Sequence, residues 1–411
     1  METPKKAHCS FCGQQQGPDI PLIAGEEGHI CEECVRLASQ VVNSWGRKRA
    51  AFKPLQNLLI PKELKGKLDE YVIGQDLSKE TLSVAIYNHY KRLQIENSQM
   101  EGMGSTREVE IEKSNILLLG PSGTGKTLLA STLARIVGVP FVIADATTLT
   151  QAGYVGEDVD SIISRLMDSA EGNRELAEWG IVYIDEIDKL ARASESSNGT
   201  RDVSGEGVQQ ALLKLVEGTQ LKLGGKGRKD SNAENVINTR NILFIAGGAF
   251  AGLDKLLEKR MQKGQRSIGF HADFSDQDLD TLHLLEQVQA DDLRQFGLIP
   301  EFIGRFPVIT GLHDLDEKAL VRILTEPRNA LVRQFQKLFE FEGVALDFTE
   351  SALTEIAQQA IARGTGARGL RGVMETLLRK VMFEMPGQQA TSCLVDEQAV
   401  RGEKALAIAS N

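Results

Sequence analysis

A glycine-rich loop between a short apolar run and a helical pattern limits the fold of this chain more than any other feature. The loop reads Gly120-Pro121-Ser122-Gly123-Thr124-Gly125-Lys126-Thr127; the run Ile116–Leu119 precedes it and the pattern Leu128–Val137 follows it. The order strand, loop, helix fits G-x-x-x-x-G-K-[ST], in which backbone N–H groups surround phosphate oxygens and the helix N-terminus favours negative charge. The pattern predicts a nucleotide site in which Lys126 contacts the β- and γ-phosphates and the Thr127 hydroxyl binds Mg²⁺.

A second apolar run, Ile181–Ile184, ends in the two carboxylates Asp185 and Glu186. A carboxylate at the end of a strand beside a phosphate loop can hold Mg²⁺, and its neighbour can activate the attacking water as a general base. The alternative is a plain acidic turn after a strand. Phosphoryl transfer also calls for an arginine near the γ-phosphate. Arg305 and Arg368 are both candidates, and the residues alone do not choose between them.

Helical patterns alternate with short apolar runs through most of the chain, which predicts parallel strands joined by crossover helices. We expect an α/β fold, with a small, mostly helical C-terminal domain and an N-terminal cysteine-rich module. The predicted parts are the module at 1–50, a linker with Pro54 and Pro61 at 51–62, the large domain at 63–311 and the small domain at 312–411.

One helix of the small domain is predicted over Thr349–Gly364, with Gly364 as its stop. Its apolar positions fall on one helical face. They are Leu353, Ile356, Ala357, Ala360 and Ile361.

Four of the five cysteines lie within the first 34 residues, as Cys9-x-x-Cys12 and Cys31-x-x-Cys34. Two such pairs at this separation are typical of a Zn²⁺ ion held by four thiolates in a tetrahedral shell. The segment is too small to build a core, so the metal would supply its folding energy. A redox pair or two disulfides are the alternatives, and a reducing compartment disfavours both. His8 and His29 adjoin the cluster and are expected to be bystanders, as the lone Cys393 is expected to be an ordinary thiol.

The composition is that of an ordinary globular chain, with 41% hydrophobic and 25% charged residues and a net charge of −10 among 411 residues. An acidic chain lacks the basic bias of a dedicated nucleic-acid binder, so nucleic acid is not an expected partner. No apolar run is long enough for a membrane span, and no apolar segment follows the N-terminal Met1–Lys6 as a secretory signal would require. We therefore expect a cytoplasmic protein without a membrane partner.

The loop Gly120–Thr127 and the stretch Ile181–Lys189 together resemble the AAA+ ATPases, and the four-cysteine head resembles one family among them, the ClpX unfoldases of the Clp protease. The resemblance spans nearly the whole chain and implies ATP, Mg²⁺ and Zn²⁺ as cofactors. It is also carried by Tyr71-Val72-Ile73-Gly74-Gln75, Gly153–Asp158, Arg201–Gly207, Pro300–Arg305 and Gly366–Arg371.

These matches imply roles that the residues alone do not reveal. Val72 and Ile73 would contact adenine, Arg368 would act within its own subunit, and Arg305 would reach the site of a neighbour. The resemblance thus implies a homohexameric ring that hydrolyses ATP to unfold and translocate proteins. Tyr154 and Val155 would grip unfolded or tagged substrates in the pore, and the zinc module would recruit adaptors. The tripeptide Ile268-Gly269-Phe270 would dock on a ClpP-type peptidase.

The chain departs from the family at one place. A loop that carries Arg-Lys-His in ClpX and helps to recognise the ssrA tag reads Arg228-Lys229-Asp230 here, which puts tag choice in question. The wider AAA+ class often has a polar residue at the end of the fourth strand. The corresponding run ends in Ala246-Gly247-Gly248 here, so no residue is assigned to that role.

Two other functions stay open at this point. One is an ATPase that remodels nucleic-acid complexes through the zinc module, against which the acidic charge and Tyr154 argue. The other is a chaperone that never meets a peptidase, against which the tripeptide at 268–270 argues.

Overall fold

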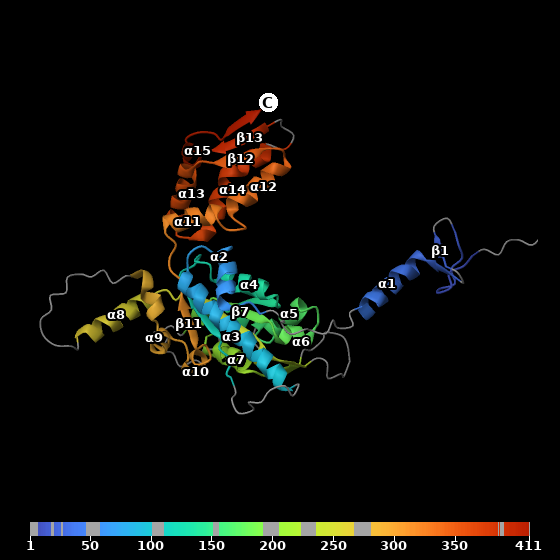
Figure 1. The fold of residues 1–411 in the computed structure, drawn as a ribbon, viewed down its shortest axis with the longest axis horizontal. Coiled ribbons are helices and arrows are strands. Elements are labelled where there is room, and N and C mark those ends of the chain that lie inside the picture. Colours follow the sequence, from blue (N-terminus) through green and yellow to red (C-terminus); the bar gives the residue numbers. More distant parts are fainter. Residues whose placement is uncertain are drawn as a thin grey trace, which may run out of the picture. The chain divides into compact units, whose positions relative to one another are not determined.

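The computed structural model describes residues 7–17, 20–25, 28–46, 58–100, 111–150, 156–191, 205–222, 236–266, 281–384, 386 and 390–410. The chain divides into two compact units, Met1–Pro54 and Leu55–Asn411, which are described separately (Figure 1).

The centre of the larger unit is a parallel sheet in the order β11-β3-β10-β7-β4. Every neighbouring pair in it runs parallel. The inner strands β3, β10 and β7 are buried along almost their whole length, as expected for a sheet covered on both faces. The strands are β3 (Ile116–Leu119), β4 (Phe141–Asp145), β7 (Ile181–Asp185), β10 (Leu243–Gly248) and β11 (Val308–Gly311).

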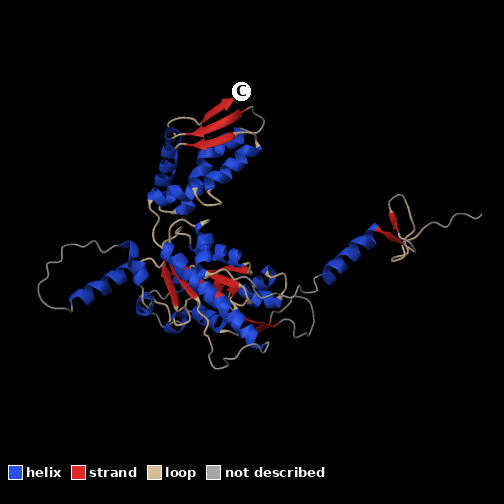
Figure 2. Cartoon of the chain, viewed as in Figure 1, coloured by secondary structure: helices blue, strands red, loops and turns tan. Residues whose placement is uncertain are grey.

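Helices surround this sheet, and one apolar core joins its strands to them (Figure 2). This architecture confirms the predicted α/β class. The α-helices are α2 (Pro61–Asp69), α3 (Asp76–Met100), α4 (Lys126–Val137), α5 (Ser161–Ser169), α6 (Arg174–Glu178), α7 (Glu206–Glu217), α8 (Leu253–Arg266), α9 (Ala290–Phe296) and α10 (Pro300–Ile303). Short 3₁₀ turns are η1 (Ile187–Leu190), η3 (Thr239–Asn241) and η4 (Thr281–Gln287), and small strand pairs are β5 (Leu149–Thr150) with β6 (Glu157–Asp158) and β8 (Gln220–Lys222) with β9 (Val236–Asn238).

The C-terminal part of this unit has a core of its own between helices and a three-stranded sheet. The predictions from the sequence did not include this sheet, in which β12 runs parallel to β13 and β13 antiparallel to β14. Its elements are α11 (Glu317–Thr325), α12 (Leu331–Phe341), β12 (Ala345–Phe348), α13 (Glu350–Ala362), α14 (Ala367–Glu384), β13 (Ala390–Val395), α15 (Glu397–Arg401) and β14 (Ala407–Ser410).

Helix α13 follows its prediction closely, with one error. The Thr349 side chain caps it by accepting a hydrogen bond from the Ala352 N–H at 3.2 Å, and Gly364 follows with a left-handed φ of 63°. Four of the five predicted apolar positions are buried. Ile361 is 46% exposed, because it lies at the last turn of the helix and at the edge of its apolar face.

The smaller unit contains an antiparallel pair, β1 (Leu22–Ala24) with β2 (His29–Cys31), followed directly by α1 (Glu32–Gly46). Across the described ranges of both units, no helix combines the length and the apolar character needed to cross a membrane.

Candidate functional site: a phosphate loop and a thiolate cluster

The glycine-rich loop adopts a conformation that its glycines make accessible. Gly125 has a φ of 103° and directly precedes α4, so the loop turns into the helix at a residue without a side chain. Gly123 has a φ of 86°, and a Cβ atom there would lie 2.7 Å from the Thr365 carbonyl oxygen. The loop therefore lies against the segment that leads into α14.

Lys126 is buried at the first turn of α4 and has neutral partners. Its Nζ donates hydrogen bonds to the carbonyl oxygens of Gly120 and, at 2.8 Å, of Pro121. Burial lowers the pKa of Lys126, while the charges of Asp185 and Asp188 act in the opposite direction. A buried ammonium group held by backbone carbonyls suits a phosphate, whose oxygens would satisfy it better.

Asp185 ends β7 directly across from the loop. Its Oδ2 accepts a hydrogen bond from the Thr127 hydroxyl at 3.0 Å, and its Oδ1 accepts one from the Glu186 N–H at 3.0 Å. A hydroxyl and a carboxylate at this separation are the hard oxygen ligands that Mg²⁺ prefers. The residues present therefore fit a magnesium nucleotide.

Glu186 stands in an unusual backbone conformation for a residue other than glycine, with φ 55° and ψ 34°. Such a conformation costs free energy, and residues held in it cluster at active sites. The Glu186 side chain is exposed and lines the same cavity as Lys126 and Asp185, which has a volume of about 460 Å³.

The two candidate arginines differ in their surroundings. Arg368, in the first turn of α14, lines this cavity and its Nη1 lies 3.4 Å from the Ser122 hydroxyl. Arg305 does not line it; its Nη2 donates to Glu217 of α7 at 2.7 Å, and its side chain is half exposed. The structure thus brings Lys126, Thr127, Asp185, Glu186 and Arg368 together and leaves Arg305 elsewhere on the surface.

The segment at 71–75 is anchored beside the loop helix. The Tyr71 ring lies under the Arg135 guanidinium of α4, 4.4 Å from the ring centre, and the Gln75 side chain exchanges two hydrogen bonds with the His313 backbone. Val72 and Ile73 are buried between α2 and α3, and neither lines the 460 Å³ cavity.

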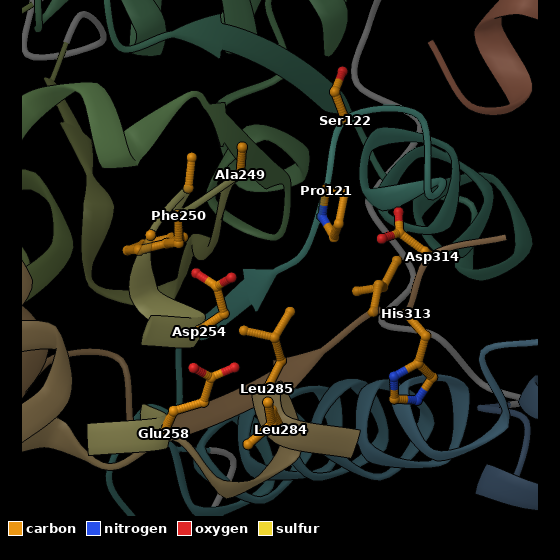
Figure 3. A pocket seen from close by; sticks show the side chains of 13 residues that line it. Pro121, Ser122, Ala249, Phe250, Asp254, Glu258, Leu284, Leu285, His313 and Asp314 are labelled. Atoms are coloured by element: carbon orange, nitrogen blue, oxygen red, sulfur yellow. The ribbon is translucent and has the colours of Figure 1, made fainter. Parts of the chain in front are cut away.

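A larger cavity of about 530 Å³ adjoins the first and shares Ser122 and Ala249 with it. Figure 3 shows Asp254 and Glu258 on one side of it and Asp314 on the other. Lys126, Asp185 and Glu186 are absent from its lining, so the features of phosphoryl transfer belong to the smaller cavity.

The four cysteines of the smaller unit converge. Their Sγ atoms all lie within 4.8 Å of one another, and those of Cys12 and Cys31 are 3.6 Å apart. In the described part of the chain, this cluster contains neither His8 nor His29.

The thiols of the cluster have opposite pKa shifts. Burial raises the pKa of Cys9, but backbone N–H groups of Cys12, Cys31 and Phe11 outweigh it and lower the pKa to about 6. Burial and the three neighbouring thiols raise the pKa of Cys34 to about 12. Four thiolates this close need a cation between them, and the separations suit the tetrahedral sulfur shell of Zn²⁺.

Two relatives match almost the full length of the chain. It is 61% identical over 406 residues to "ATP-dependent Clp protease ATP-binding subunit ClpX 3" of Methylococcus capsulatus, covering 97% of this chain and 93% of that protein. It is 57% identical over 399 residues to "ATP-dependent Clp protease ATP-binding subunit ClpX" of Azotobacter vinelandii, covering 96% and 90%.

The chain belongs to the ClpX family. Residues 7–44 match the ClpX C4-type zinc finger, residues 111–309 the AAA domain (Cdc48 subfamily), and residues 315–395 the C-terminal, D2-small domain of ClpB protein. This ClpX chain is therefore an AAA+ ATP hydrolase of the Clp ATP-binding type with a zinc finger at its N-terminus, as the resemblance implied.

Several predicted site residues of this chain lie outside the described residues. They are Tyr154 and Val155, the tripeptide Ile268-Gly269-Phe270, and Arg228-Lys229-Asp230. Their roles stay predictions.

The sequence interpretation assigned no role to Asp188, which lines the cavity, or to Tyr183, which is buried next to Asp185 and does not line the cavity. Asp188 lines the cavity, and its Oδ1 accepts a hydrogen bond from the Ala249 N–H at 3.1 Å. Tyr183 donates to Asp185 at 3.2 Å. The sequence signal that could have identified Tyr183 was its spacing of two residues from Asp185, since residues two apart on a strand lie on the same face of the sheet.

Proposed function

We propose that this ClpX chain is an ATP-driven unfoldase and translocase that feeds proteins to a ClpP-type peptidase in the cytoplasm. The observation that supports this most is the gathering of Lys126, Asp185 and Glu186 with Arg368, which comes from a different part of the chain. A phosphate site that contacts the C-terminal part can couple the state of the nucleotide to the position of that part.

We assign the roles at this site as follows. Magnesium-bound ATP supplies the γ-phosphoryl group and the cation that offsets its charge. The residues Gly120–Thr127 hold the phosphates, Asp185 and Thr127 orient the cation, and Glu186 takes the proton of the attacking water. Arg368 contacts the phosphates within the subunit, and Val72 and Ile73 contact adenine.

Arg305 fits a role between subunits. Because it is half exposed and lies outside its own cavity, it can serve a neighbour in a homohexameric ring once its pair with Glu217 opens. We also propose the division into 1–50, 51–62, 63–311 and 312–411, which the break after Pro54 and the separate apolar core of the C-terminal part support.

The residues that we propose to contact the protein substrate lie outside the described ranges. We propose that Tyr154 and Val155 grip unfolded or tagged proteins in the pore and that the zinc module recruits substrates or adaptors. Asp230 is expected to weaken capture of a tag that ends in a free carboxylate, because like charges repel.

Replacing Phe270 by alanine tests the peptidase partnership. We expect degradation of a substrate by the ClpX–ClpP pair to fall at least about tenfold, because six weakened contacts lose avidity together. ATP hydrolysis and unfolding measured without peptidase should stay at the wild-type rate. The control is Phe341→Ala, which removes an exposed ring from α12. Normal degradation by Phe270→Ala would show that this tripeptide does not dock on the peptidase.

A further inference from the structure

Strand β7 carries a buried tyrosine beside the carboxylate at its end. Tyr183 and Asp185 are two residues apart, so their side chains lie on the same face of the sheet. The Tyr183 ring is fully buried, and its hydroxyl donates a hydrogen bond to Asp185 Oδ1 at 3.2 Å.

The Asp185 carboxylate is held by three donors. Oδ1 accepts from the Tyr183 hydroxyl and from the Glu186 N–H, and Oδ2 accepts from the Thr127 hydroxyl. Two donors on one oxygen and one on the other define both the position and the plane of the carboxylate. Tyr183 is the donor that belongs neither to the glycine-rich loop nor to the turn after β7.

Strand β10 leaves room for this tyrosine. Ile245 pairs with Tyr183, so Gly247, two residues further, lies on the same face next to the tyrosine ring. A Cβ atom on Gly247 would lie 2.1 Å from the Tyr183 hydroxyl oxygen and 2.9 Å from Cζ. Any side chain at this position would displace the hydroxyl from Asp185.

Gly248, the next residue of β10, leaves room for Asp188 in the same way as Gly247 leaves room for Tyr183. A Cβ atom on Gly248 would lie 2.6 Å from Asp188 Oδ1, the atom that accepts from the Ala249 N–H. The end of β10 therefore lacks polar side chains of its own and makes space for polar groups from β7 and η1.

We propose that Tyr183 is a positioning residue for Asp185, and that Gly247 is the small residue which this arrangement requires. The Tyr183 hydroxyl orients the carboxylate toward the place where the magnesium nucleotide binds. This inference rests on the proposed role of Asp185 in holding Mg²⁺. Groups that orient a metal ligand through a hydrogen bond commonly change metal affinity when they are removed.

The test is the Mg²⁺ concentration that half-saturates binding of a fluorescent, non-hydrolysable ATP analogue. For Tyr183→Phe we expect this half-saturating Mg²⁺ concentration to rise about tenfold. That is the lower end of the loss in metal affinity seen when a group that orients a metal ligand is removed. Binding of the analogue in EDTA should be unchanged, and in steady-state hydrolysis kcat should fall more than KM rises at limiting Mg²⁺.

Gly247→Ala is expected to raise the Mg²⁺ requirement in the same way. Its effect should be smaller in the Tyr183→Phe background, because the hydroxyl oxygen is the closest atom to the added methyl group. Such non-additivity is the signature of a shared arrangement, which a general loss of stability would not produce.

The matched control is Tyr90→Phe. Tyr90 is also fully buried, and its hydroxyl donates to the Trp179 carbonyl oxygen at 3.0 Å, away from the phosphate loop. We expect Tyr90→Phe to lower the melting temperature while the Mg²⁺ requirement stays at the wild-type value. If Tyr183→Phe behaves in the same way as Tyr90→Phe, the inference is wrong.

Asp185→Asn separates this inference from the function on which it rests. An unchanged Mg²⁺ requirement in Asp185→Asn would refute the proposed role of Asp185 and the inference with it. A large rise in Asp185→Asn without a rise in Tyr183→Phe would refute only the role of Tyr183.

Discussion

Replacing Glu186 by glutamine is expected to slow ATP hydrolysis at least about a hundredfold, the lower end of what a general base contributes. Glutamine has the same length and can still hydrogen-bond to water, but it cannot accept the proton. Nucleotide affinity should remain within about twofold of wild type, because the phosphate contacts that we assign to Lys126 and Thr127 persist. The measurements are steady-state hydrolysis and equilibrium binding of ATP.

Glu171 offers a matched control for this substitution. It is an exposed glutamate of the same domain, and its φ of 53° is close to the 55° of Glu186. Glu171→Gln makes the same change of charge at a residue with a similar positive φ, and Glu171 does not line the cavity. Near-normal turnover by Glu186→Gln, or an equal loss in Glu171→Gln, would show that Glu186 is not the base.

Removing zinc is expected to unfold the N-terminal unit. Structural zinc sites contribute about 10–16 kcal/mol in small domains, far more than β1, β2 and one helix can supply through packing. Cys31→Ser should therefore abolish zinc binding and the helical signal of α1. Basal ATP hydrolysis should continue, since the nucleotide site belongs to the other compact unit.

Cys393→Ser is the control for the zinc prediction. Cys393 is buried on β13 and takes no part in the cluster. The variant should keep one zinc per chain by metal analysis. Protein purified without a chelator that contains no zinc, or a Cys31→Ser unit that stays folded, would contradict a structural metal.

Local sequence patterns predicted the elements that carry the chemistry. The apolar run Ile116–Leu119 is β3, the glycine loop leads into α4, and Asp185 ends β7 as its position after a buried run indicated. These features depend on residues adjacent in the chain. The cysteine spacing likewise predicted a convergence that the sulfur positions confirm.

Local sequence patterns could not predict the features that depend on contacts between segments far apart in the chain. The sheet β12-β13-β14 joins short strands separated by helices, and the exposure of Ile361 depends on what lies beside α13. The surroundings that distinguish Arg368 from Arg305 arise only when α14 reaches the loop. The relation of Tyr183 to Gly247 likewise requires that β7 and β10 be neighbours.

The central claim is that this ATPase acts on polypeptides. Its most direct test compares the rate of ATP hydrolysis in the presence of unfolded protein with the rate in the presence of DNA. We expect a permanently unfolded protein to raise the rate severalfold and double-stranded DNA to leave it unchanged. In Tyr154→Ala we expect a basal rate near that of wild type and poor unfolding of a stable folded protein. Stimulation by DNA without stimulation by unfolded protein would contradict the account and favour a remodeller of nucleic-acid complexes.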